Sequence, residues 1–159
     1  MKAVILTISD GCAAGARTDL SGPELSKLLT AEGWQVTDPT IVPDTREAIR
    51  KTILHLTSLK DIDLVVTTGG TGVAPRDVTP EAVRPLLEKE IPGIGELMRL
   101  RGLEKTDFAA ISRSLAGCRH KTLILCLPGN PKGAVESLQA VLHLVPHIVD
   151  LLKGKTEHT

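Results

Sequence analysis

Apolar runs of strand length alternate along the chain with longer stretches of helical spacing. Lys2–Ser9 is a continuous run rich in β-branched residues, which predicts a strand buried on both faces. Asp63–Thr68 and Lys121–Leu127 are two further runs of this kind. Trp34–Val42 predicts another strand, and Pro39 interrupts it, which favours the edge of a sheet.

The segments between these runs carry apolar residues three and four positions apart, which is typical of helices that pack on a sheet. Ser21-Gly22-Pro23-Glu24 and Asp44-Thr45-Arg46-Glu47 resemble capping boxes and predict two helix starts. A long final helix should be kinked or interrupted by Pro146. Residues 102–117 show no clear pattern. Two further helices are expected from Thr79 to about Lys89 and from Gly93 to Leu100.

This alternation of strands and helices predicts a doubly wound α/β fold with three αβα layers, in which a mostly parallel sheet carries helices on both faces. The chain has 159 residues, which fits a single domain spanning residues 1–159. One Phe, one Trp and no Tyr mean that aliphatic side chains must fill the core.

Charge and cysteine content narrow the classes of function. Nineteen basic and nineteen acidic residues give no net charge, which argues against a nucleic-acid or membrane partner but permits a small anionic ligand. Cys12, Cys118 and Cys126 form no CxxC pair, so reduced thiols are expected. The N-terminal apolar run is far shorter than a membrane span, and no cleavage site follows it. These features predict a cytoplasmic protein.

Three loops of unusual composition follow predicted strands, at residues 9–19, 69–79 and 128–133. In a parallel sheet, the loops at the carboxyl ends of the strands meet at one edge, where ligands bind. We therefore expect these loops to form a single crevice.

The loop at Thr68-Gly69-Gly70-Thr71-Gly72 is the strongest candidate for a ligand-binding loop, because three of its five residues are glycine. Its glycines allow positive φ angles and let backbone N–H groups approach a ligand, so the loop could hold a phosphate or another oxyanion. It is neither a Walker A loop nor a dinucleotide fingerprint. The alternative is a tight turn with a structural role only.

Two carboxylates accompany these loops. Asp77 could bind Mg²⁺ or orient a nucleotide, or it could pair with Arg76 or cap the helix at Thr79. Asp44 could reach the same cleft, or its position in a capping box could explain it fully.

Other polar segments leave similar alternatives open. Ser112-Arg113-Ser114 could supply hydroxyls and a cation to phosphate oxygens, or form an ordinary polar turn. Asn130 and Pro131 suit the start of a helix whose N–H groups would attract an anion. His143 and His147 lie four residues apart, but without a third ligand a partly buried or surface pair is favoured over a metal site.

Several of these segments together resemble the signature of the molybdopterin-binding family. Val65–Gly72, followed by Pro75–Glu81, closely resembles its central motif. The family's "SD", "PD", "SRS" and "PGNP" segments are matched in family order, so the resemblance covers nearly the whole chain. These matches are Ser9-Asp10, Pro43-Asp44, Ser112–Ser114 and Pro128–Pro131.

The resemblance is to the family's single-domain members of the MogA and MoaB type and to the G domain of gephyrin. It implies a homotrimer that joins ATP and molybdopterin into adenylyl-molybdopterin and pyrophosphate, with Mg²⁺ as cofactor. It also leaves open a molybdopterin carrier or scaffold without catalysis. A transient contact with a MoeA-type molybdenum insertase, whose extra domains this chain lacks, is a further expectation.

The resemblance also assigns roles to residues. Asp77 would be the principal catalytic or magnesium-linked carboxylate, with Asp44 as its helper. The residues that would bind the pterin or the nucleotide are Ser9, Asp10, Thr68, Gly69, Gly70, Thr71, Gly72, Ser112, Ser114, Pro128, Gly129, Asn130 and Pro131.

Overall fold

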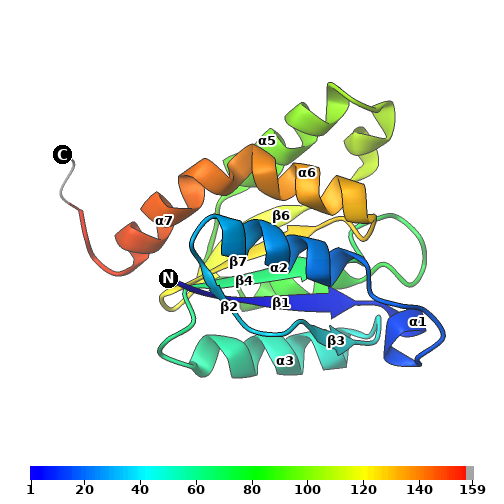
Figure 1. The fold of residues 1–159 in the computed structure, drawn as a ribbon, viewed down its shortest axis with the longest axis horizontal. Coiled ribbons are helices and arrows are strands. Elements are labelled where there is room, and N and C mark those ends of the chain that lie inside the picture. The colour runs from blue at the N-terminus through cyan, green and yellow to red at the C-terminus, as the bar shows by residue number, and fades with distance from the viewer. Residues whose placement is uncertain (157–159) are drawn as a thin grey trace.

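The computed structural model describes residues 1–156, which form a sheet between two layers of helices (Figure 1). Residues 157–159 of the predicted domain lie outside this description. Within residues 1–156 the sheet has seven strands. They are β1 (Lys2–Ile8), β2 (Gln35–Val36), β3 (Thr40–Val42), β4 (Leu64–Thr68), β5 (Lys89–Glu90), β6 (Leu115–Arg119) and β7 (Thr122–Leu127).

The strand order is β2-β1-β4-β7-β6-β5, and β3 also pairs with β1. All pairs are parallel except those of β6, which runs antiparallel to both β7 and β5. After β1 the chain crosses to β2 on one side, whereas after β4 it continues to β5, β6 and β7 on the other. The neighbours β1 and β4 thus form a topological switch point, which is where open α/β sheets bind ligands.

Helices cover both faces of the sheet, which confirms the predicted doubly wound, mostly parallel fold. In Figure 1, α2 (Ser21–Ala31), α6 (Pro131–Val141) and α7 (Val145–Leu152) lie above the sheet and α3 (Arg46–Ser58) lies below it. Alternate strand residues serve the two cores. In β7, Leu123 and Leu125 pack with α2 and α6, whereas Ile124 packs with α3, and all three are fully buried.

Residues 102–117, which have no clear sequence pattern, contain the 3₁₀ helix η2 (Asp107–Ile111) and strand β6. β6 was hidden because it is short and contains Gly117, where an added Cβ would lie 2.6 Å from the Lys89 carbonyl oxygen. The preceding helix α5 spans Pro92–Leu103.

The helix predicted from Thr79 to about Lys89 is shorter than expected. α4 (Thr79–Val83) gives way to the 3₁₀ helix η1 (Arg84–Leu86), because Pro85 lacks the N–H group that would continue the α-helix. The chain then enters β5.

Both predicted capping boxes are wrong in detail. The N-cap of α2 is Leu20, which makes no side-chain cap bond. Oδ1 of the preceding Asp19 accepts from the N–H of Gly22 (3.0 Å), while Ser21 donates its hydroxyl to the Gly129 carbonyl (2.8 Å). Helix α3 is capped by Thr45, whose Oγ1 accepts from the N–H of Ala48 (3.2 Å). Asp44 therefore does not cap α3.

The final helical stretch, Pro131–Leu152, consists of α6, the 3₁₀ helix η3 (Leu142–Leu144) and α7. Pro146 lies in the first turn of α7, so the predicted interruption is confirmed. By length and composition alone, this 22-residue stretch could cross a membrane, because an 18-residue window within it has a mean hydropathy of 1.3. Leu138, Val141 and Val149 are fully buried in the core beside the sheet, so one face of this stretch packs inside the protein, and 28% of the window is buried.

Candidate active site

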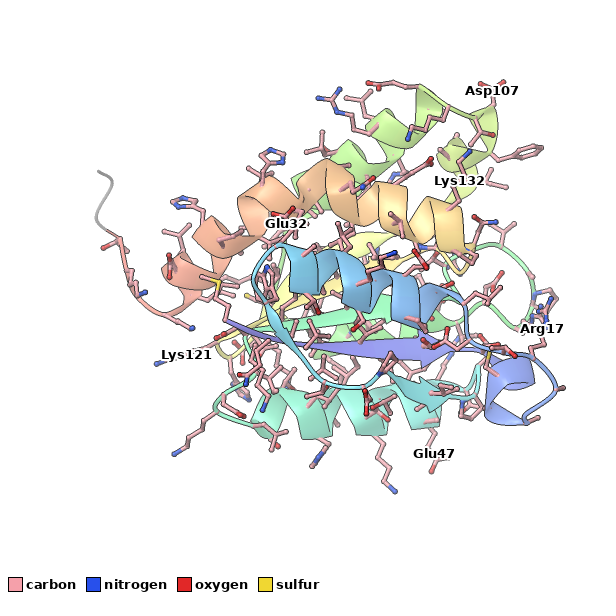
Figure 2. All side chains as sticks on the ribbon, in the orientation of Figure 1. Arg17, Glu32, Glu47, Asp107, Lys121 and Lys132 are labelled. Carbon is pink, nitrogen blue, oxygen red and sulfur yellow. The ribbon has the colours of Figure 1, made fainter. Side chains whose placement is uncertain are left out.

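A cleft of about 670 Å³ opens at the carboxyl ends of β1, β4 and β7, so the expected crevice is confirmed. Figure 2 shows Arg17, a cleft residue, at the end of the molecule opposite Lys121 of the β6–β7 turn. Of the residues assigned by the family resemblance, only Asp10 and Ser114 do not line the cleft. Those that do are Ser9, Asp44, Thr68, Gly69, Gly70, Thr71, Gly72, Asp77, Ser112, Pro128, Gly129, Asn130 and Pro131.

The glycine loop after β4 presents backbone N–H groups to this cleft. Gly69 and Gly70 have φ angles of 109° and 68°, which favour glycine. Within residues 1–156, the N–H groups of Gly70, Thr71 and Gly72 have no hydrogen-bond acceptor. Three consecutive N–H groups without a protein acceptor on one cleft-lining loop are free to bind an oxyanion.

The glycine loop is fastened to the turn after β7. Thr68 donates its hydroxyl to the Pro128 carbonyl (2.7 Å), and the N–H of Gly69 donates to the Leu127 carbonyl (3.1 Å). A Cβ added to Gly129 would lie 3.2 Å from Cα of Gly69, which is a tight contact, so the two loops approach each other closely here. The glycine loop and the turn after β7 are therefore held together on one side of the cleft.

Asp44 stands beside the glycine loop. A Cβ added to Gly70 would lie 3.5 Å from Asp44 Oδ1. Burial, together with the negative charges of Asp10 and Asp77, raises the pKa of Asp44, although the N–H of Asp10 and the charge of Arg76 act in the opposite direction.

Asp77 closes the loop at its other end. Its Oδ2 accepts from the N–H of Ala74 (2.9 Å), and a Cβ added to Gly72 would lie 2.7 Å from the same oxygen. The N-cap of α4 is Val78, which makes no side-chain cap bond, so Asp77 does not cap that helix. Among the described salt bridges there is none between Arg76 and Asp77.

Ser9 and Asn130 both line the cleft and cap helices. Asn130 Oδ1 accepts from the N–H of Gly133 (3.0 Å) at the start of α6, as the sequence predicts. Ser9 Oγ accepts from the N–H of Cys12 (3.2 Å) and starts α1 (Asp10–Ala13), within a segment that was expected to be a loop. Their structural roles are therefore established, and their roles in binding stay predictions.

The Ser112–Ser114 segment departs from expectation. The Arg113 guanidinium donates to the carbonyls of Gly72 and Asp77 and pairs with Glu81, so it is not the free cation that phosphate binding would need. Ser112 and Ser114 share a hydrogen bond between their hydroxyls (2.9 Å). Ser114 is only 3% exposed and lies outside the cleft lining.

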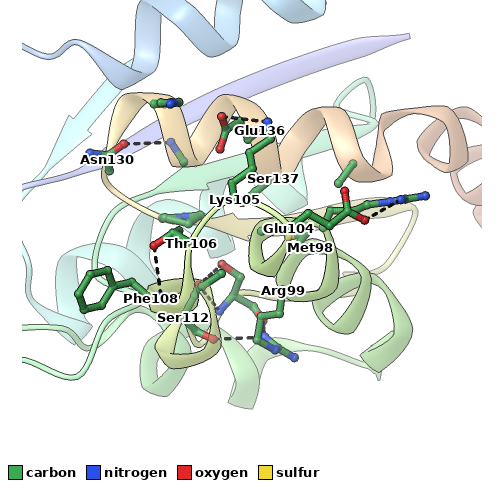
Figure 3. Close-up of a pocket in the computed structure, with 18 of the residues that line it drawn as sticks. Met98, Arg99, Glu104, Lys105, Thr106, Phe108, Ser112, Asn130, Glu136 and Ser137 are labelled. Atoms are coloured by element: carbon green, nitrogen blue, oxygen red, sulfur yellow. Dashed lines mark hydrogen bonds and ion pairs between the residues drawn. The ribbon is translucent and has the colours of Figure 1, made fainter.

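A second groove of about 660 Å³, shown in Figure 3, adjoins the cleft between α5, η2 and α6. Phe108, Ser112, Pro128 and Asn130 line both. An ion pair between Lys105 and Glu136 (3.0 Å) links the η2 side of the groove to α6. The cleft and the groove together could accommodate a ligand larger than a phosphate.

Some cleft residues have no sequence signal that would have marked them. Thr7 lies within an apolar strand, and its hydroxyl donates to Asp19 Oδ2 (2.8 Å) in the loop that follows. Phe108 and Ile111 belong to the segment without a clear pattern, and Phe108 is 78% exposed. An exposed lone Phe in such a segment is the only available hint.

The cleft offers few side-chain ligands to a metal ion. Within residues 1–156 no group of three or more His, Cys, Asp or Glu side chains could hold a metal ion. Asp44 Oδ1 and Asp77 Oδ1 accept no hydrogen bond among the described residues. This set fits Mg²⁺, which is usually bound by one or two carboxylates together with substrate phosphates. His143 and His147 are exposed, as predicted.

The fold and the cleft define a class of protein: a doubly wound α/β protein with a glycine-lined cleft at the switch point of its sheet. The model of a family described as "Probable molybdopterin binding domain" matches residues 4–147, and the chain belongs to this family.

Individual relatives agree with this assignment. A molybdopterin adenylyltransferase of Helicobacter pylori (strain J99) is 42% identical over 155 residues, covering 94% of this chain and 86% of the relative. The molybdenum cofactor synthesis protein cinnamon of Drosophila melanogaster is 43% identical over 150 residues, which is 93% of this chain and 25% of that protein. The crystal structure of MoaB from Thermus thermophilus is similar with a TM-score of 0.90 and 48% identity, covering 97% of both chains.

Proposed function

We propose that this chain is a molybdopterin adenylyltransferase, which transfers AMP from ATP to the terminal phosphate of molybdopterin and releases pyrophosphate. The observation that carries the proposal is the row of unpaired N–H groups at Gly70–Gly72 beside two carboxylates, Asp44 and Asp77. The relatives that bear this name support it over nearly the whole chain.

In the proposed reaction, an oxygen of the molybdopterin phosphate attacks the α-phosphorus of ATP. The bond from that phosphorus to the bridging oxygen breaks, and pyrophosphate leaves with the electron pair. Both reactants are anions, so the protein must position them and offset their repulsion. The N–H groups of Gly70–Gly72 would hold phosphate oxygens, and no covalent enzyme intermediate is needed.

Mg²⁺ is part of the proposal, and Asp77 and Asp44 are the residues that would hold it against the nucleotide phosphates. When bound, it would neutralise negative charge on the phosphates. The two carboxylates are held in advance, Asp77 by the Ala74 N–H and Asp44 by the Asp10 N–H, so little ordering is required when the substrate binds.

We also infer a cytoplasmic location, because ATP and molybdopterin would be available there. The homotrimer and the contact with a MoeA-type insertase stay predictions from the family resemblance. They can be checked by analytical ultracentrifugation and by co-purification with such an insertase.

The proposal is tested by incubating the purified chain with molybdopterin, ATP and Mg²⁺ and analysing the products by mass spectrometry. We expect adenylyl-molybdopterin and pyrophosphate in equal amounts. Molybdopterin binding without either product would instead identify a carrier or scaffold.

A further inference from the structure

Arg113 connects the segment before β6 to the glycine loop. Its Nε donates to the Gly72 carbonyl (2.8 Å), its Nη2 to the Asp77 carbonyl (2.9 Å), and its backbone N–H to the Thr71 carbonyl (2.8 Å). Its Nη1 forms an ion pair with Glu81, which lies in the first turn of α4. Each of these bonds ends on the loop or on the helix that follows it.

The charge of Arg113 is satisfied inside the protein. The Arg113 and Glu81 side chains are 34% and 33% exposed, and the hydrogen bond from Arg113 lowers the pKa of Glu81. Glu81 Oε1 accepts from Arg113, and the buried Oε2 has no hydrogen-bond partner within residues 1–156. Glu81 is therefore held as a carboxylate whose main described partner is this guanidinium.

The bonds of Arg113 also determine which way the loop peptides point. In a trans peptide, the C=O and the following N–H point in opposite directions. The Thr71 and Gly72 carbonyls accept bonds from Arg113, so the N–H groups of Gly72 and Val73 point away from it. Neither N–H has an acceptor among the described residues, and Gly72 lines the cleft.

We propose that Arg113 and Glu81 form a positioning pair that orients the glycine loop, with no direct contact between Arg113 and the substrate. This inference rests on the proposed function, because it assigns the loop to the polyphosphate of ATP. Without Arg113, the Thr71–Gly72 and Gly72–Val73 peptides can rotate and turn carbonyl oxygens toward the cleft. Those oxygens would repel a phosphate where N–H groups had bound it.

The competing role, a cation that contacts phosphate directly, predicts different mutant behaviour. A direct cation would be replaced in part by lysine, and removal of Glu81 would free it to bind more tightly. A positioning pair needs the guanidinium fork, which lysine lacks. It also needs Glu81, and loss of both partners should be no worse than the more severe single loss.

The experiment compares Arg113→Lys, Arg113→Gln, Glu81→Gln and the Arg113→Gln/Glu81→Gln double variant by calorimetric titration with ATP and, separately, with pyrophosphate. We expect each to weaken binding by about tenfold or more, in the range of a lost charge-assisted hydrogen bond. Arg84→Gln is the matched control, because Arg84 pairs with Glu90 on the surface at 56% side-chain exposure, and it should bind within about twofold of wild type.

Hydrogen exchange at the amides of Gly72 and Val73 gives a second readout that does not depend on ligand. It should change in the Arg113 and Glu81 variants and not in Arg84→Gln, with thermal unfolding verifying that each variant folds. Wild-type affinity in Arg113→Lys or Glu81→Gln would overturn the positioning role. Normal ATP binding by wild type without adenylyl-molybdopterin would overturn the proposed function alone, and a wild-type chain that bound neither probe would overturn both.

Discussion

Asp10 and Asp44 each hold the backbone of the other. The N–H of Asp10 donates to Asp44 Oδ2 (2.8 Å), and the N–H of Asp44 donates to Asp10 Oδ1 (2.8 Å). This reciprocal pair joins the loop after β1 to the loop after β3 and leaves Asp44 Oδ1 facing Gly70. The same arrangement places the negative charges of Asp10 and Asp44 close together, with Asp77 nearby.

The raised pKa of Asp44 predicts how the stability of the protein depends on pH. Because burial raises the pKa of Asp44 above 3.8, the folded state favours its protonated form. The stabilising contribution is present below about pH 3.8 and is lost as pH rises through the folded pKa. At neutral pH, Asp44→Asn should therefore unfold in urea with the same or a higher free energy than wild type, and its advantage should shrink toward pH 3.8.

Asp61→Asn is the control with the opposite sign. The Lys2 hydrogen bond lowers the pKa of exposed Asp61, so its contribution is present above the unfolded pKa and lost as pH falls through the folded pKa. This variant should not gain stability at neutral pH. A clear loss of stability in Asp44→Asn under the same conditions would contradict the account of Asp44.

The glycine loop yields a steric prediction. Gly72→Ala places a Cβ 2.7 Å from Asp77 Oδ2 and should displace that carboxylate, lowering AMP transfer by about tenfold or more. Gly93→Ala in α5 is the control, since an added Cβ there meets nothing within 4 Å and turnover should be unchanged. The two variants are compared by their initial rates at saturating ATP. Equal rates would mean that AMP transfer does not depend on the observed position of the Asp77 carboxylate.

Asn130 both caps α6 and lines the cleft, and two substitutions can distinguish these roles. Asn130→Ala removes the acceptor for the Gly133 N–H and should cost about 0.5–2 kcal/mol of unfolding free energy. Asn130→Asp keeps a cap but adds negative charge to the cleft, so stability should hold while ATP affinity falls. If Asn130→Asp binds ATP as wild type does, the phosphates do not come near α6.

The three cysteines should differ in reactivity. Cys118 and Cys126 are buried, and burial raises the pKa of Cys126 to about 12, whereas Cys12 lines the cleft. Under native conditions a maleimide should modify Cys12 alone, more slowly when ATP is bound. Peptide mass spectrometry identifies the modified residue, and labelling of Cys12 at the same rate with and without ATP would place the nucleotide elsewhere.

Local patterns predicted the parts of the fold that depend on local sequence. The buried runs at β1, β4 and β7 and the Asn130 cap were evident, because strand burial and helix capping leave a short-range signature. β6 was not, since its conformation depends on pairing with β7 and on the contact of Gly117 with Lys89.

The contrast between local sequence and tertiary contacts also explains how much of the site could be predicted. The convergence of the loops followed from the parallel sheet, but the orientation of individual side chains did not. From sequence, Arg113 could have been a phosphate-binding cation or part of a polar turn. Only the tertiary contacts with Gly72, Asp77 and Glu81 show that its guanidinium is bound within the protein. Asp19 accepts from the Gly22 N–H at the start of α2 and from the Thr7 hydroxyl, and no spacing along the chain could indicate these two contacts.

The central claim is that the cleft carrying Asp77 is where AMP is transferred. Asp77→Asn tests it most directly, because the amide oxygen can still accept from the Ala74 N–H, so the fold and pterin binding should remain. With ATP labelled at the α-phosphate, the variant should form adenylyl-molybdopterin at least about 100-fold more slowly than wild type. Transfer at the wild-type rate would remove Asp77 from the reaction and contradict the account.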